Sequence, residues 1–407
     1  MHIECSNGSP MMNTLDHLPP LPLFVCYSLS DLVPGTMPTQ AWEQDELGLY
    51  YALRLHGRIR HIGLELPPSI LRKVLALMNE NFPILERLSL TYWLSDSDDD
   101  GYRLPKAFLA PNLLHLTLLN VGLSKRLRVL TSTVSLVTLM LGGIQTSSYF
   151  RPRLLVARLR SLPQLEELSI SFSAPIPRPS TERELLGEKG APIILPSLKT
   201  LSFHGVGAYL ESLVAQIRVP LLEQLSIRLY NQIAFVLPHL FYLINITKVF
   251  KLSSARISFH HDEVRVSTFH DLEQIPFSLS LMCKPLDWQI DCAAQICHGL
   301  IPTLSGVEEL LLPFVGYDEE EIPAEMRNGA IDSATWHDIL RPFIRVKELY
   351  INDGLSEELS RALQEDDVGL DPGFLPNLRS IAAKDNMFTS FIDSRLVAGH
   401  LVRLVEY

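Results

Sequence analysis

The chain has few cysteines for its length. Five occur in 407 residues, scattered as Cys5, Cys26, Cys283, Cys292 and Cys297. A small secreted protein held by disulfides carries a dense and even set, so this distribution indicates reduced thiols. The N-terminal residues also lack a basic region followed by an apolar run, which argues against a secretory signal. We expect a location in the cytoplasm, with the nucleus as the alternative.

The chain is also poor in basic residues. Lys and Arg total 35 against 46 Asp and Glu, which gives a formal net charge of -11. A negative chain repels phosphate backbones and anionic lipid, so we expect no nucleic acid and no membrane as partner. The apolar stretch 233–250 is interrupted by Pro238, Asn245 and Lys248. It therefore predicts a buried helix running into a strand rather than a helix that spans a bilayer.

Motifs that carry catalysis are missing. No nucleophile elbow or phosphate-binding loop occurs, and "GVGAY" from Gly205 lacks the third glycine of a dinucleotide loop. We predict that the chain is not an enzyme and uses no cofactor and no metal. An enzyme whose site has no recognisable motif stays open as an alternative.

The acidic stretches favour solvated loops over metal sites. Residues 96–101, "DSDDDG", match the opening of a calcium loop, but its twelfth position is Ala107, where a bidentate Glu is needed. Residues 318–325, "DEEEIPAE", are expected to be an exposed insertion. Residues 260–263, "HHDE", are neighbours on a strand and point to different sides, so we predict surface residues there. Cys292 and Cys297 have no second pair of thiols, which predicts two buried helical thiols rather than a zinc site.

A recurring phrase, Pro-x-Leu-x-x-Leu-x-Leu, is the main positive feature. Successive anchors are separated by 28, 23, 29, 33 and 24 residues, and irregular spacing near this length is typical of leucine-rich repeats. Alternation in Leu-x-Leu predicts a short strand, and Pro fits before it because its nitrogen cannot donate to a ladder. These five spacings join Pro83, Pro111, Val134, Pro163, Pro196 and Pro220, and later copies begin at Val307, Val346 and Pro376.

The repeats predict an α/β leucine-rich-repeat solenoid. Apolar stripes at 69–78 and 208–217 predict helices behind the strands, and one unit alone cannot bury its apolar face. We expect parallel strands on the concave face, helices outside, and a register of leucines in the core. The domain prediction is an N-terminal segment and cap at 1–45 and the solenoid at 46–407. Residues 228–300 are the least regular, and two degenerate units are expected there.

An ordered set of segments carries a family resemblance. It includes "LPPLPLFVCYS", "FPILERLSL", "LAPNLLHLTL", "LPSLKTLSFHGVGAYLESLVAQI" and "WHDILRPFIRVKELYINDGLSEELSRAL". From about Leu18 to Tyr407 the chain resembles the C-terminal region of the F-box and leucine-rich-repeat proteins of mushroom-forming fungi. The resemblance implies substrate recognition for a cullin ubiquitin ligase. Because only 17 residues precede Leu18, we expect the ligase adaptor as a partner only if an F-box is supplied elsewhere.

The candidate binding surface is the set of outward positions on the strands. Alternation places a column of small hydroxyl residues on the concave side, flanked by charged and polar side chains. We predict a non-catalytic module that recognises a protein target there, and the alternative is a stand-alone scaffold or sensor with no ubiquitin link. The predicted partner-binding residues are Glu167, Ser169, Thr200, Ser202, His204, Gln224, Ser226 and Arg228.

Overall fold

The protein has a mixed α/β fold with a mostly parallel sheet, which confirms the predicted class. Its computed structural model describes residues 2–4, 21–27, 39–92, 102–124, 127–175, 192–230, 235–271, 274–315, 333–365, 375–383, 386–397 and 399–405. The chain divides into two compact units. Unit 1 comprises residues 1–205 and 215–222, and unit 2 comprises residues 206–214 and 223–407.

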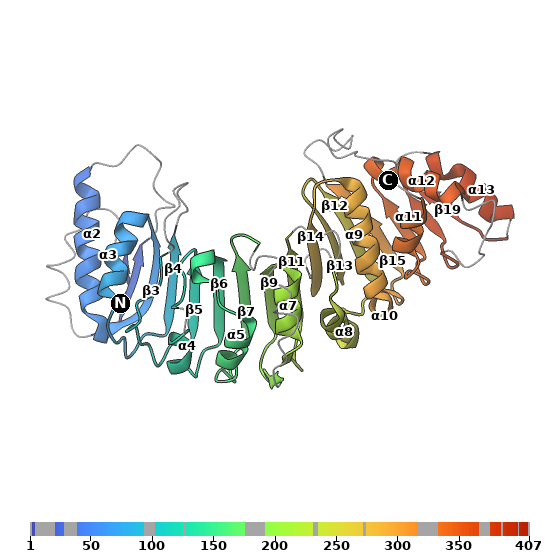
Figure 1. Cartoon of the computed structure of the whole chain (residues 1–407). Helices are drawn as coiled ribbons and strands as arrows, with labels where there is room; N and C mark the ends of the chain where they lie inside the picture. Colours follow the sequence, from blue (N-terminus) through green and yellow to red (C-terminus); the bar gives the residue numbers. More distant parts are fainter. Residues whose placement is uncertain are drawn as a thin grey trace. The chain divides into compact units, whose positions relative to one another are not determined.

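Unit 1 is a ladder of parallel strands in chain order, visible from blue to green in Figure 1. Each strand pairs in parallel with the one before it, and β8 and β10 form a separate parallel pair. The strands are β1 His2–Glu4, β2 Leu23–Tyr27, β3 Ile59–Leu66, β4 Arg87–Tyr92, β5 His115–Leu119, β6 Thr138–Ile144, β7 Glu167–Phe172, β8 Ile193–Ile194, β9 Thr200–Gly205 and β10 Ile217–Arg218.

Alternation along these strands buries one side of the ladder. In β4 the buried residues are Leu88, Leu90 and Tyr92, whereas the residues between them are half-buried or exposed. The leucine at the second position of each phrase is aligned across five neighbouring strands, as Leu88, Leu116, Leu139, Leu168 and Leu201. All five are fully buried. Burial of one such side chain stabilises the fold by about 1.5–3 kcal/mol, so this row is a large part of the core.

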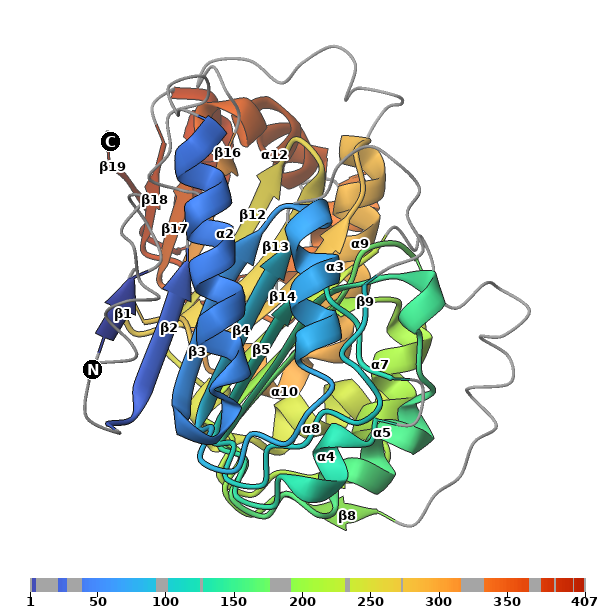
Figure 2. The ribbon, with the colours of Figure 1, turned by 90° about the vertical axis from the view of Figure 1, so that its left-hand side faces the viewer.

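Helices of unit 1 cover the apolar side of the ladder. Figure 2 shows α3, α4 and α5 on the same side of the strands. In α3 the predicted stripe is confirmed, because Ile70, Leu71, Val74 and Leu75 are its buried residues. The helices are α2 Thr39–Arg54, α3 Pro68–Leu77, α4 Val129–Ser132 and α5 Pro152–Leu159.

Polar contacts at the start of the strands repeat along the chain. The Asn112 side chain donates to the carbonyl of Pro83, 2.7 Å away, in the preceding repeat of unit 1. Asn377 makes the same contact with Ile344 in unit 2, at 2.8 Å. Ion pairs join residues at or just before the start of neighbouring strands, as Arg60–Glu86, Lys199–Glu166 and Lys347–Glu308. Water and salt screen these exposed pairs, so the pairs support the strand register more than the stability.

Unit 2 departs from the predicted all-parallel order. Strand β11 pairs in parallel with β14, and β12 pairs in parallel with β15, while β13 lies antiparallel between β12 and β14. The two degenerate repeats expected within 228–300 are thus replaced by a three-stranded meander. The strands are β11 Gln224–Leu229, β12 Ser254–His260, β13 Glu263–Phe269, β14 Phe277–Met282, β15 Glu309–Leu312, β16 Phe314–Val315, β17 Glu348–Ile351, β18 Ser380–Ala382 and β19 Arg403–Val405.

The core of unit 2 keeps the leucine register after the meander. Leu310, Leu349 and Ile381 are aligned on β15, β17 and β18, and each is fully buried. Helix α9 packs on β12 and β13 and against α11. The helices are α7 Gly207–Val214, α8 Pro238–Ile246, α9 Leu286–Gly299, α10 Ile301–Leu304, α11 Ser333–Leu340, α12 Asp353–Glu365 and α13 Thr389–Val397.

The apolar stretch 233–250 contains helix α8 but is not fully buried. Leu240 and Ile244 are buried, whereas Tyr242 is 64% exposed and Ile246 is 54% exposed. The buried Glu211 of α7 accepts hydrogen bonds from the backbone N–H of His239 at 2.6 Å and of Leu240 at 3.2 Å. A carboxylate at the start of a helix satisfies donors that have no partner within the helix, so Glu211 fixes where α8 begins.

Several predictions lie outside the described residues. They concern the acidic stretch 96–101, the insertion 318–325 and Cys5. The domain boundaries predicted at residues 45 and 46 stay a prediction.

Candidate functional site

The half-buried or exposed side of the strands, called the open face here, carries all the predicted partner-binding residues. On β7 and β9 of unit 1, Glu167 is aligned with Thr200, and Ser169 with Ser202. Ser171 precedes the end of β7 and its hydroxyl lies 3.2 Å from Nδ1 of His204. These residues are half-buried.

The hydroxyl column of unit 1 extends over five strands. Ser89, Thr117, Ser169 and Ser202 share one row, and Met140 of β6 stands in the same row between Thr117 and Ser169. The open face of unit 1 is therefore mostly polar, with Met140 in this row and the partly exposed Leu119 of β5 as apolar members.

The other predicted residues belong to unit 2. Gln224 and Ser226 are exposed on β11, and Arg228 is half-buried on the same strand. The structure thus places five of the eight predicted residues in unit 1 and three in unit 2. Their role in binding a partner stays a prediction.

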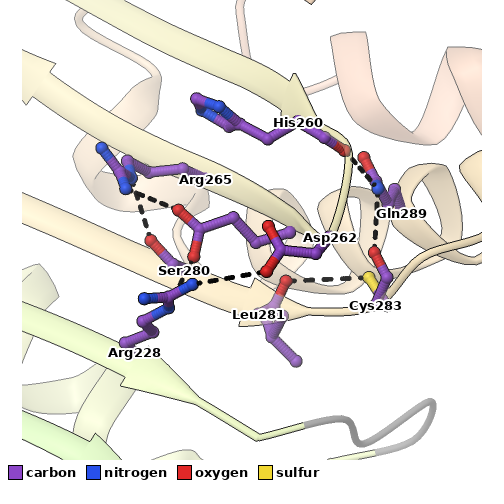
Figure 3. Close-up of polar contacts among 9 residues, drawn as sticks. Arg228, His260, Asp262, Arg265, Ser280, Leu281, Cys283 and Gln289 are labelled. Carbon is purple, nitrogen blue, oxygen red and sulfur yellow. Dashed lines mark hydrogen bonds and ion pairs between the residues drawn. The ribbon is translucent and has the colours of Figure 1, made fainter. Parts of the chain in front are cut away.

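Arg228 is held in an ionic cluster that the sequence analysis did not foresee, shown in Figure 3. Its Nε lies 2.7 Å from Oε2 of Glu263, and a terminal nitrogen lies 3.7 Å from Oδ2 of Asp262. Arg265 reaches the other oxygen of Glu263 at 2.5 Å and donates from Nε to the Ser280 hydroxyl at 3.0 Å. One carboxylate therefore bridges two guanidinium groups above β14.

Glu263 corrects the prediction that residues 260–263 are surface residues. Its side chain is only 5% exposed, whereas Arg228 and Arg265 are 42% and 40% exposed. A buried carboxylate without a partner is costly, and the two arginines provide opposite charge and donors. The sequence signal was available in Glu263 and Arg265, which stand two apart on one strand and so face the same side.

His260 lies at the edge of this cluster. Burial, together with the positive charge of Arg265, lowers its pKa, and the negative charges of Glu263 and Asp262 act in the opposite direction. Its Nε2 lies 3.1 Å from the Ser258 hydroxyl. At neutral pH the ring is therefore an uncharged hydrogen-bonding group.

A buried glutamine fastens the turn that carries Asp262. The Gln289 amide nitrogen on α9 lies 2.7 Å from the carbonyl of His260 and 2.8 Å from that of Cys283 (Figure 3). Gln289 is fully buried, as are Cys292 and Cys297 on the same helix, which confirms the predicted burial of the two thiols. Burial raises the pKa of Cys297, so this thiol stays protonated.

Unit 1 presents an arginine in a different setting. His61, Arg87 and His115 are aligned on β3, β4 and β5 and form what we call the His–Arg–His row. Arg87 is exposed, and its guanidinium makes no ion pair or hydrogen bond with the part of the chain that the structure describes. The Nδ1 atom of His115 lies 3.2 Å from the Thr138 hydroxyl, and the His61 ring packs edge-on against Phe24.

Both histidines respond to Arg87. Burial lowers the pKa of His61, and the charges of Arg87 and Arg60 lower it further, while Glu86 partly offsets them. Burial and then Arg87 lower the pKa of His115, against smaller opposite effects of Glu167 and Glu86. The row therefore carries one permanent positive charge and two neutral imidazoles at neutral pH.

Unit 2 has a cavity of about 320 Å³ away from its open face. It is lined by Lys251, Ser253, Ser305, Gly306 and Arg345, together with Glu308, which is ion-paired to Lys347. The lining also includes the apolar residues Leu252, Pro302 and Ile344, and none of its described residues is a nucleophile paired with a base.

The described residues contain neither a metal-binding cluster nor a membrane-spanning helix. No group of three or more His, Cys, Asp and Glu side chains within these ranges is arranged to hold a metal ion. Among the helices that the structure describes, none is both long and apolar enough to cross a membrane.

Comparison with known proteins shows no family for the chain. No family model matches it, and no curated protein matches it either. The resemblance to the F-box and leucine-rich-repeat proteins therefore stays a prediction.

Proposed function

We propose that the chain is a non-catalytic module that recognises a protein target through the open faces of its strands. The observation that carries the proposal is the row Ser89, Thr117, Ser169 and Ser202, which aligns hydroxyl groups on one half-buried surface above a fully buried leucine row. Such a surface offers hydrogen bonds ~4.8 Å apart on adjacent strands, interrupted by Met140 between Thr117 and Ser169.

We further propose that the strand and helix units are leucine-rich repeats of a solenoid. The aligned leucines, the proline before several of the strands and the repeated Asn112 and Asn377 contacts support this architecture. By the family resemblance, the module is the substrate-recognition region of an F-box-type receptor. A scaffold with no ubiquitin link is the alternative.

Capture of a partner by crosslinking from cell extract tests the recognition proposal. The open-face variant Ser169→Lys/Ser202→Glu keeps the net charge and replaces two aligned hydroxyls with long side chains. We expect it to reduce capture tenfold or more, equivalent to ~1.4 kcal/mol.

The matched control changes exposed residues of α3 on the helical side. Ser69→Lys/Ala76→Glu also keeps the net charge, and both positions are exposed. Capture should persist in this control. Equal capture by both variants, or loss in the α3 variant alone, would place the binding surface elsewhere.

Addition of the purified ligase adaptor separates the two biological roles. We expect no binding to this chain alone, because the segments that carry the resemblance follow the F-box in that family. Micromolar binding would contradict this expectation and link the chain directly to a ligase.

A further inference from the structure

The His–Arg–His row of unit 1 places one guanidinium between two imidazoles on the open face. We propose that it binds an acidic peptide segment, with one carboxylate of the segment seated against Arg87. This inference rests on the proposed function, because it names the chemistry of the protein target that the open face recognises.

The first support is the state of the arginine. Arg87 is exposed and has no carboxylate partner within the described ranges, whereas Arg228 and Arg265 of unit 2 share Glu263 (Figure 3). A guanidinium presents a planar fork of donors that matches a carboxylate, and such charge-assisted bonds are among the stronger ones. Arg87 therefore has its full donor capacity available to a ligand.

The second support is the set of donors around the arginine. The two imidazoles flank Arg87 on neighbouring strands ~4.8 Å away on each side. Ser89 and Thr117 lie one step along the same face and add two hydroxyls. A carboxylate on Arg87 can thus accept further hydrogen bonds without moving any strand.

The surface favours a peptide over other anions. The row lies on a broad strand face that continues over Thr138, Glu167 and Thr200, which suits an extended segment better than a small enclosed ion. The net charge of -11 opposes approach to a membrane or a nucleic acid. A short segment responds mainly to charges within a Debye length of ~10 Å, so the local row decides its binding.

The charges that face His61 and His115 predict that the row binds an acidic peptide more tightly in mild acid than at neutral pH. His61 faces Arg60, Glu86 and Arg87, and His115 faces Arg87, Glu86 and Glu167. The positive neighbour Arg87 opposes protonation of both rings in the free protein, and a bound carboxylate would offset it. Protonation and binding therefore favour each other.

The probe is a fluorescein-labelled hexaglutamate peptide, with a hexaglutamine peptide as the neutral reference. Binding to the full chain is measured by fluorescence anisotropy at about pH 7.5 and about pH 5.5, where glutamate with its pKa of ~4.3 stays ionised. We expect binding of hexaglutamate only, tighter at the lower pH. The variant Arg87→Gln should weaken it at least about fivefold. Arg153→Gln, an equal change of charge at an exposed position of α5, should leave it unchanged.

A second readout distinguishes this site from general charge attraction. Histidine titration by NMR, assigned with His61→Gln and His115→Gln variants, should show the pKa values of both rings rise when hexaglutamate is added. Equal affinity of the Arg87→Gln and wild-type chains, absence of hexaglutamate binding, or unmoved histidine pKa values would each overturn the inference. If a partner is still captured through Ser169 and Ser202 in that case, the proposed function stands and only its acidic chemistry fails.

Discussion

The arginines on the open faces of the two units have different neighbours. In unit 1, Arg87 stands between two histidines with no carboxylate bound to it among the described residues. In unit 2, Arg228 and Arg265 meet over Ser280 and share the buried Glu263. The same alternation places all three arginines outward, so the difference comes from strand order. The comparison teaches that an arginine on such a face is a binding candidate only after its neighbouring strands are known.

The largest effect on stability should come from the row of buried leucines that each unit contains. Leu168→Ala in unit 1 and Leu310→Ala in unit 2 each empty a fully buried position. Each should lower the free energy of unfolding by about 2–5 kcal/mol. Urea denaturation followed by circular dichroism measures the loss. Leu119→Ala, at a 37% exposed position of β5, is the control and should cost far less. Similar losses in all three variants would mean that the leucine rows are not the core.

The next largest effect on the free energy of unfolding should distinguish the arginine cluster of unit 2 from Arg87 of unit 1. Glu263→Gln leaves two arginines facing each other around a buried amide and should cost about 1–3 kcal/mol, less than for a fully buried pair because both arginines are half-exposed. Arg87→Gln should change the free energy of unfolding by no more than about 0.5 kcal/mol. Urea denaturation followed by circular dichroism measures the free energy of unfolding of both variants. A neutral Glu263→Gln would show that the cluster is not structurally required.

The smallest effect concerns pH. The folded pKa values of His61 and His115 lie below the model-peptide value of 6.5. As the pH falls below that value, the unfolded chain takes up protons first, so the free energy of unfolding decreases. The His61→Gln/His115→Gln variant should show a weaker decrease between about pH 6.5 and 5, above the range in which carboxylates titrate. An unchanged pH dependence would mean that the row does not perturb its histidines.

The strands and the core were predictable because they depend on local spacing. The phrase around Leu88 or Leu168 contains a period of two, and a period of two decides which side chains are buried once a strand forms. Where a proline precedes the phrase, it marks the approach to the strand. The aligned, fully buried leucines of unit 1 confirm this part of the sequence analysis.

The meander of unit 2 and its ionic cluster could not be predicted in this way. Val264 and Val266 of β13 alternate with polar residues as the apolar residues of a parallel strand do, and alternation carries no information about strand direction. Glu263 can be buried because it contacts both Arg265 of its own strand and Arg228, which lies 35 positions earlier in the sequence on the far side of β14. Contacts between residues so far apart follow from strand order, which no local pattern reveals.

Helix α9 packs on two strands of the meander, and this affects how strongly the sheet can bend there. Neighbouring strands are ~4.8 Å apart, whereas packed helices need 8–10 Å, so a unit with one helix for every strand is wider at the back than at the front. That mismatch curls a parallel ladder around its strand side. Where α9 packs on both β12 and β13, fewer helices stand behind the strands, and the mismatch is relieved. We therefore expect the sheet to curl less at the meander than in a ladder with one helix behind each strand, so that a rigid target shaped to a curled ladder would lose contact there.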